Sequence, residues 1–231
     1  MTGKLQVIAS RFKSPEFSEP TGIVGGGDAL ALRELTAFFN KIGFKKFETL
    51  YIDERHLDRR ANLVLLGGID TNQVTTDALE LIKPNVRIVD PGPQIKVEIH
   101  DLAPEPCPEQ SSIEAGTPRK YQANDKIEYG IIIRARNPFE PSKAIIIIAG
   151  TYGYGTWGAV DLIQQESFLR RCEQLDLAGS NSSTPARRSP ISFMRRTRRL
   201  RYWSPLECIF EVKIFDNRPY APEIIIFRPL L

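Results

Sequence analysis

The sequence predicts an α/β fold: a single three-layer domain around a mixed, mostly parallel sheet, with a C-terminal antiparallel hairpin. Three observations lead to this prediction. Short apolar runs alternate with stretches of helical periodicity, two of these runs are followed by glycines and then a helix, and two strand-like segments close the chain. A length of 231 residues suits one domain, so we expect 1–231 to fold as one unit.

The first part of the chain predicts two strand–helix units. Leu5–Ala9 has the composition of an opening strand, and 28–42 carries its apolar residues at helical spacing, with Asp28 as the expected N-cap. Leu63–Leu66 is wholly apolar, which is typical of a strand that is covered on both faces. A second helical stripe is expected over 74–82.

The middle of the chain predicts strands separated by proline-containing loops. Val86–Val89 and Ile95–Ile99 are strand-like, and the short turn between them makes them antiparallel neighbours, because a parallel crossover needs more residues. The segment 103–124 holds four prolines and no apolar periodicity, so we expect a loop that interrupts the sheet. Ile127–Ala135 is expected to continue the same sheet as its next strand.

The last part predicts a strand–glycine–helix unit and a closing hairpin. Ala144–Ile148 is an apolar strand, and one helix follows it with apolar residues on one face as far as Leu175. The segment 178–204 is rich in serine and arginine, so we expect a mobile loop within the domain. Leu206–Phe215 alternates in polarity and, with 223–227, predicts a hairpin at a sheet edge.

Composition excludes several classes of protein. The chain has no apolar run of about 18 residues, which a transmembrane helix needs, and its first residues lack the basic-then-apolar order of a signal peptide. Three scattered cysteines do not predict a disulfide framework and favour a reducing compartment. We therefore expect a cytoplasmic protein with no membrane partner, and the sequence leaves self-association open.

The charge of the chain is distributed unevenly. The formal net charge is only +3, from 31 basic and 28 acidic residues. However, 177–205 contains seven arginines and no lysine, aspartate or glutamate, so the rest of the chain has a net charge of −4. The sequence thus describes a mildly acidic body with one concentrated basic segment, and local charge is what a partner meets.

The most specific local pattern is a glycine loop after the apolar strand 144–148. Gly153, Gly155 and Gly158 match G-x-G-x-x-G between a strand and a helix, where dinucleotide-binding proteins cradle phosphate. Ordinary NAD binding is not predicted, because Glu173, at the spacing of a ribose-binding acid, falls within the helix. The alternative is that these glycines serve only a tight turn and close packing of the helix on the sheet.

A second glycine loop, 67–72, follows the apolar strand 63–66. Asp70 could accept hydrogen bonds from ribose hydroxyls. The N-cap preference of asparagine favours Asn72 as the cap of the next helix, and the alternative is that it joins Asp70 at the ligand. Ligand crevices of open α/β sheets lie beyond the carboxyl ends of strands, so the two loops flank one pocket if their strands are neighbours. The glycines at 25–28 form a third wall or serve only as a lead-in to their helix.

In this hypothesis backbone amides hold an anion, Tyr152 or Trp157 stacks on a base, and Asp70 contacts a hydroxyl. The expected ligand-binding residues are Gly67, Gly68, Asp70, Asn72, Gly150, Tyr152, Gly153, Gly155, Thr156 and Trp157.

The two strand–glycine–helix units, LVLLGGIDTN and IIIIAGTYGYGTWG, resemble Rossmann-like nucleotide-sensing modules of bacterial defence and signalling proteins, such as the SLOG and CARF groups. The resemblance is confined to these two units. It implies a Rossmann-like domain that binds a nucleotide-derived ligand at the two loops, and some members cleave such ligands. No catalytic residue and no cofactor are implied for this chain.

The sequence lacks the patterns of several enzyme classes. There is no G-x-x-x-x-G-K-[ST] loop and no G-x-S-x-G turn, and His56 and His100 have no partner at metal-ligand spacing. The leading hypothesis is a sensor-like module that binds a nucleotide-derived or other anionic small molecule. The alternative is an enzyme that cleaves or transfers a nucleotide or nucleoside on the same loops; Asp70, Glu128 and Tyr152 are among the conceivable groups.

A third hypothesis places the function in the arginine segment Arg187–Arg201. Arginines pair with phosphates and stack on bases, and aromatic rings stack as well, so this segment is suited to single-stranded nucleic acid or to a protein partner. The other interpretation is that the arginines pair with the acidic body, within one molecule or between subunits. The residues concerned are Arg195, Arg196, Arg198, Arg199, Arg201 and Trp203.

Overall fold

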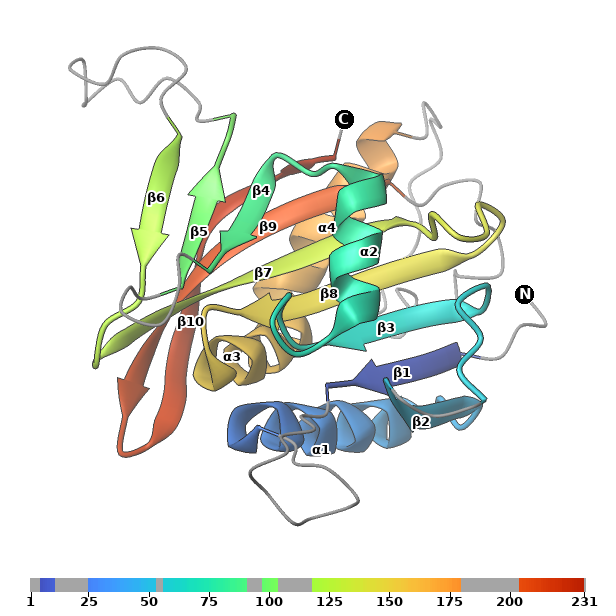
Figure 1. Ribbon diagram of the computed structural model, residues 1–231, viewed down its shortest axis with the longest axis horizontal. Helices are drawn as coiled ribbons and strands as arrows, with labels where there is room; N and C mark the ends of the chain where they lie inside the picture. Colours follow the sequence, from blue (N-terminus) through green and yellow to red (C-terminus); the bar gives the residue numbers. More distant parts are fainter. Residues whose placement is uncertain are drawn as a thin grey trace.

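The computed structural model describes residues 5–10, 25–52, 56–90, 97–103, 118–179 and 204–230. Its strands form a seven-stranded sheet of order β10-β9-β7-β8-β3-β1-β2 and a three-stranded sheet of order β4-β5-β6 (Figure 1). The large sheet consists of β1 (Leu5–Ala9), β2 (Phe47–Tyr51), β3 (Asn62–Leu66), β7 (Ile127–Arg136), β8 (Ala144–Gly150), β9 (Leu206–Phe215) and β10 (Arg218–Pro229). The small sheet consists of β4 (Val86–Val89), β5 (Glu98–Asp101) and β6 (Arg119–Gln122), and the helices are α1 (Gly26–Lys41), α2 (Gln73–Ile82), α3 (Gly153–Gln164) and α4 (Glu166–Gly179).

The large sheet is parallel in one half and antiparallel in the other. β2, β1, β3 and β8 run parallel to one another, whereas β8, β7, β9 and β10 pair antiparallel. The predicted α/β class and mixed sheet are confirmed, but the parallel pairs are only three of the six. The reason is local: β7 and β8 are joined by a short connection, which suits an antiparallel pair and not a parallel crossover.

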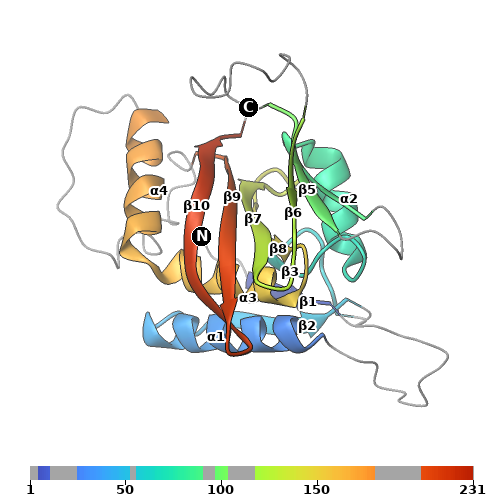
Figure 2. The same ribbon diagram turned by 90° about the vertical axis from the view of Figure 1, so that its left-hand side faces the viewer.

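Two outer layers cover the large sheet (Figures 1 and 2). On one face α1, α3 and α4 pack against alternate residues of the strands, and this core includes Leu35, Val160 and Phe210. On the other face α2 and the small sheet pack against the intervening residues, and this core includes Ala78 and Ile147. β3 is buried along its whole length, as its apolar sequence predicts.

The small sheet corrects the expectation of one sheet interrupted by a loop. The predicted antiparallel pairing of β4 with β5 is confirmed, although β5 begins at Glu98. β6 lies inside the predicted loop 103–124 and pairs with β5, while 104–117 lie outside the described residues. Only Lys83–Asn85 separate α2 from β4, which keeps β4 in the outer layer beside α2.

A buried ion-pair network fixes the small sheet to the large one. The guanidinium of Arg228 on β10 donates to Asp101 on β5 at 2.6 Å and to Glu207 on β9 at 2.5 Å. Glu207 also accepts a hydrogen bond from the backbone N–H of Asn85 at 2.8 Å. Because Asp101 and Glu207 are fully buried, these partners offset the free-energy cost of burying their charges.

Two helices stand where the sequence predicted one. α3 ends at Gln164, and Gln165 adopts an extended conformation before α4 begins. The helical residues reach Gly179, so the predicted loop 178–204 begins later than expected, and 180–203 lie outside the described residues. In the part of the chain that the structure describes, no helix is long and apolar enough to cross a membrane.

The closing hairpin is confirmed. Asp216 and Asn217 have φ angles of 50° and 55°, which give the two-residue turn that joins β9 to β10. β10 begins at Arg218 and not at 223 as predicted, so the strand includes Pro219 and Pro222. Its pairing with β9 shifts register between Tyr220 and Glu223. Prolines are tolerated there because β10 is the outermost strand of the sheet.

Candidate functional site

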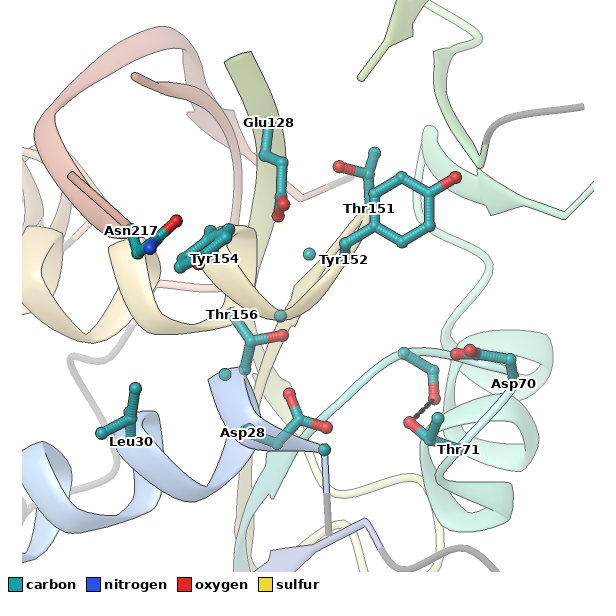
Figure 3. Close-up of a pocket in the computed structure, with 16 residues that line it drawn as sticks. Asp28, Leu30, Asp70, Thr71, Glu128, Thr151, Tyr152, Tyr154, Thr156 and Asn217 are labelled. Carbon is teal, nitrogen blue, oxygen red and sulfur yellow. Dashed lines mark hydrogen bonds between the residues drawn. The ribbon is translucent and has the colours of Figure 1, made fainter. Parts of the chain in front are cut away.

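A cavity of about 480 Å³ lies where β1, β3 and β8 end (Figure 3). β3 is the neighbour of both β1 and β8, so these parallel strands end at one edge of the sheet, and the turns after β3 and β8 meet there. The sequence predicted that the two glycine loops flank one pocket if their strands are neighbours, and β3 and β8 are neighbours. The lining residues are Gly25, Gly26, Gly27, Asp28, Leu30, Gly68, Asp70, Thr71, Glu128, Gly150, Thr151, Tyr152, Gly153, Tyr154, Thr156 and Asn217.

The first turns of α1 and α3 touch each other at the cavity through two glycines. A Cβ atom on Gly27 would lie 2.3 Å from the backbone of Gly153, and one on Gly153 would lie 2.9 Å from the Cα of Gly27. Real Cβ atoms do not approach a backbone so closely, so neither position accepts a side chain unless the helices separate. The segment 25–28 is therefore a third wall of the cavity.

The other glycines of the G-x-G-x-x-G pattern serve packing. A Cβ on Gly155 would lie 2.5 Å from the backbone oxygen of Tyr129, and one on Gly158 would lie 2.9 Å from the side chain of Val212. Gly155 is buried and does not line the cavity. These contacts bring α3 close to β7 and β9, which is the packing role that the sequence offered as the alternative.

The loop after β3 contributes some of its predicted ligand-binding residues to the cavity. Gly68, Asp70 and Thr71 line the cavity, whereas Gly67 and Asn72 do not. Gly67 has a φ of +102°, which glycine adopts without strain. Thr71 donates a long hydrogen bond of 3.4 Å to the backbone oxygen of Gly68, which closes the turn.

Asn72 has the capping role that the sequence favours for it. Its side-chain oxygen accepts hydrogen bonds from the backbone N–H groups of Val74 at 3.1 Å and Thr75 at 3.3 Å. Its amide nitrogen donates to the carbonyls of Ile8 and Leu66, and the residue is fully buried. Asn72 thus joins the start of α2 to the ends of β1 and β3.

The aromatic residues of the second loop divide between the cavity and the core. Tyr152 lines the cavity with 44% of its surface exposed, and its hydroxyl accepts a hydrogen bond from the backbone N–H of Val97 at 3.2 Å. Trp157 does not line the cavity, because it packs against the core beneath α3 and stacks on Tyr154. Of the two residues considered for stacking on a base, only Tyr152 is therefore at the cavity.

Glu128, at the beginning of β7, reaches the first turn of α3. Its carboxylate accepts a hydrogen bond of 2.6 Å from the backbone N–H of Gly155, and the amides of Tyr154 and Tyr152 also bond to it. Burial outweighs these bonds and raises the pKa of Glu128 to about 6. The sequence named Glu128 only as a conceivable group, because its approach to α3 depends on β7 pairing with β8.

Asp28 is the second carboxyl group that the structure brings to the cavity. It was expected to be the N-cap of α1, but the N-cap is Gly25 and Asp28 lies in the first turn. It accepts a hydrogen bond from the Ser10 hydroxyl and is also bonded to Thr156. Burial raises its pKa above the ordinary value. Figure 3 shows Asp28 and Glu128 approaching the start of α3 from opposite sides.

The charged side chains among the described residues that line the cavity are Asp28, Asp70 and Glu128, which are all acidic. Burial raises the pKa of Asp70, and the nearby charges of Asp28 and Asp90 act in the same direction. Among the described residues that line the cavity there is no lysine, arginine or histidine. The groups of partial positive charge in this lining are the amides at the helix starts. The described residues contain no group of three or more His, Cys, Asp and Glu side chains that could hold a metal ion.

The predicted nucleic-acid residues cannot be placed in this site. Arg195, Arg196, Arg198, Arg199, Arg201 and Trp203 lie outside the described residues. Comparison of the chain with known proteins adds no assignment, since no family model and no curated protein matches it. The fold and the cavity therefore define the protein as an α/β protein with an acidic, glycine-walled cavity at the carboxyl ends of its parallel strands.

Proposed function

We propose that the protein is a Rossmann-like binding module for a nucleotide-derived small molecule, held in the cavity where β1, β3 and β8 end. One observation carries this proposal: the turns after the adjacent parallel strands β3 and β8, together with the starts of α1 and α3, line one cavity. Its volume of about 480 Å³ falls within the usual range for small-molecule sites.

The position of the cavity in the topology supports a ligand site. α1, which follows β1, lies on one face of the sheet, and α2, which follows β3, lies on the other. β1 and β3 are neighbours, so the chain changes sides between them. In open α/β sheets such a change leaves a crevice at the carboxyl ends of the strands, and ligands bind there.

The lining residues suit the parts of a nucleotide. The exposed ring of Tyr152 offers a stacking surface for a base, and the Asp70 carboxylate accepts hydrogen bonds from ribose hydroxyls. The glycines at the start of α1 allow a phosphoryl group to approach the backbone N–H groups of the first turn. Leu30 adds an apolar contact in the same wall.

Calorimetric titration with nucleosides and their mono-, di- and triphosphates tests the proposal. We expect at least one series to bind, and Tyr152→Ala to weaken that binding by about tenfold or more because a stacking surface is lost. Tyr220→Ala is the matched control, since Tyr220 is also an exposed tyrosine but does not line the cavity. Absence of binding by every compound, or equal loss in both variants, would contradict the proposal.

A second candidate function is an enzyme that cleaves or transfers a nucleotide or nucleoside at the same cavity. The observation in its favour is that two buried carboxyl groups with raised pKa, Asp28 and Glu128, face one cavity. A carboxyl group with a pKa of about 6, such as Glu128, is suited to proton transfer near neutral pH, and burial moves the pKa of Asp28 in the same direction. Chromatography of the bound nucleotide after incubation separates the two functions: turnover that is lost in Asp28→Asn indicates the enzyme, and unchanged ligand indicates the binding module.

A further inference from the structure

The start of α3 already holds an anion that belongs to the protein. The amides of a helix start attract negative charge, and in α3 they donate to the Glu128 carboxylate. Glu128 has 5% of its surface exposed, so this bond is shielded from water. A phosphoryl group that entered this position would have to displace the carboxylate or lie directly beside it.

The start of α1 differs because its N-cap is a glycine. Gly25 has no side chain that could bond to the first-turn amides, and its backbone leads into Gly26 and Gly27 at the cavity wall. A Cβ on Gly26 would have no atom within 4 Å, so this part of the wall is open. The start of α1 thus has no side-chain cap, and Asp28 in its first turn is bonded to Ser10, so this helix start is the place that remains for an anionic group.

The remaining charges of the cavity act against a chain of phosphates. Di- and triphosphates carry several negative charges, and proteins usually bind them with lysine, arginine or a divalent metal ion. The described lining contains none of these cations, while Asp28, Asp70 and Glu128 contribute carboxyl groups. A single phosphoryl group at α1 meets Asp28, whose pKa is raised by burial, whereas a longer phosphate chain adds the repulsion of Asp70 and Glu128.

We propose, on the basis of the proposed function, that the cavity selects nucleosides and nucleoside monophosphates over di- and triphosphates, and that Glu128 is a specificity-determining residue for this choice. Its carboxylate occupies the amides of α3 and repels a second phosphoryl group. The phosphoryl group of a monophosphate lies at the start of α1, and the ribose and base extend toward Asp70 and Tyr152.

The test compares wild type with Glu128→Gln at pH 8, where the Glu128 carboxyl is ionised, without added divalent cations. Calorimetry measures dissociation constants for the adenosine, guanosine, cytidine and uridine series, from nucleoside to triphosphate. We expect triphosphates to bind wild type at least about tenfold more weakly than monophosphates. Glutamine keeps an oxygen that accepts the hydrogen bond from the Gly155 N–H but removes the charge. The ratio of monophosphate to triphosphate affinity should therefore fall by about tenfold in the variant.

Glu211→Gln is the matched control for this experiment. It removes the same charge from β9, beside Tyr129 in the register, and Glu211 does not line the cavity. We expect it to leave the ratio of monophosphate to triphosphate affinity unchanged. Melting temperatures confirm that both variants are folded.

The outcomes separate this inference from the proposed function. Triphosphates that bind wild type as tightly as monophosphates would overturn the selectivity and leave the binding function standing. A ratio that is the same in Glu128→Gln and wild type would overturn the role of Glu128. If no member of any series binds, the proposed function and this inference both fail.

Discussion

The starts of α1 and α3 have similar geometry and different occupants. Each begins at the same cavity, neither N-cap residue provides a side-chain cap, and the two first turns touch through Gly27 and Gly153. Yet the amides of α3 are bonded to Glu128, whereas α1 begins with a glycine run. A glycine-rich helix start is therefore not by itself an anion site, because a distant strand can supply the anion.

The contact between the two helix starts gives the largest expected effect. In Gly27→Ala the new Cβ meets the backbone of Gly153, so α1 and α3 must separate, and we expect a loss of about 3 kcal/mol in the free energy of unfolding. Gly26→Ala, one residue earlier in the same helix, meets nothing within 4 Å and should change stability by less than about 1 kcal/mol. Urea denaturation measures both. Equal losses in the two variants would show that the helices do not meet at Gly27.

The Glu128 carboxyl at the start of α3 predicts that the free energy of unfolding depends on pH, with an effect smaller than that of Gly27→Ala. Glu128 has a pKa of about 6 in the folded protein and an ordinary value of 4.5, so between these pH values the folded state retains a proton that the unfolded chain has released. The free energy of unfolding should therefore fall as pH rises from 4.5 to about 6, with Glu128 contributing about 2 kcal/mol.

Urea denaturation across this pH range checks the Glu128 contribution. Burial also raises the pKa of Asp28, which gives a further decrease of the same sign that remains in every Glu128 variant. Glu128→Gln should remove the Glu128 share of the slope, and Glu211→Gln keeps the Glu128 carboxyl and should keep that share. A Glu128→Gln profile with the same slope as wild type would contradict the buried position of the carboxyl group.

The last glycine of the G-x-G-x-x-G pattern gives the smallest effect. In Gly158→Ala the new Cβ meets the side chain of Val212 at 2.9 Å, and a side chain can shift, so we expect a loss of about 1 kcal/mol. Adding Val212→Ala should relieve the contact, so the double variant should lose less than the two single variants together. Additive losses in a double-mutant cycle would argue against the packing role of Gly158.

The sequence predicted the elements that depend on local pattern. The apolar runs of β3 and β8, the glycine turns after them and the closing hairpin all follow from periodicity and turn residues, and the structure contains each of them. Because β3 and β8 are neighbours, their loops meet, as expected if the strands pair. Gly68, Asp70, Tyr152 and Thr156 lie at one cavity, and their contact with a ligand stays a prediction.

The features that the sequence did not predict depend on pairing between distant segments. Glu128 reaches α3 only because β7 lies antiparallel beside β8, and no spacing in the sequence shows that neighbour. Asn72 is satisfied by the backbone of β1, a strand far from it in the chain. Trp157 faces the core because α3 turns that side toward the sheet. In each case local composition allowed two interpretations, and the tertiary contact decided between them.

The most direct test is a ¹H–¹⁵N titration of the protein with the nucleoside monophosphate that binds best. If the start of α1 holds the phosphoryl group, the amide signals of Gly26, Gly27 and Asp28 shift most. The signal of Gly155 should change little, because its amide remains bonded to Glu128. Large shifts at Gly155 with unchanged signals from α1 would contradict this account of the site.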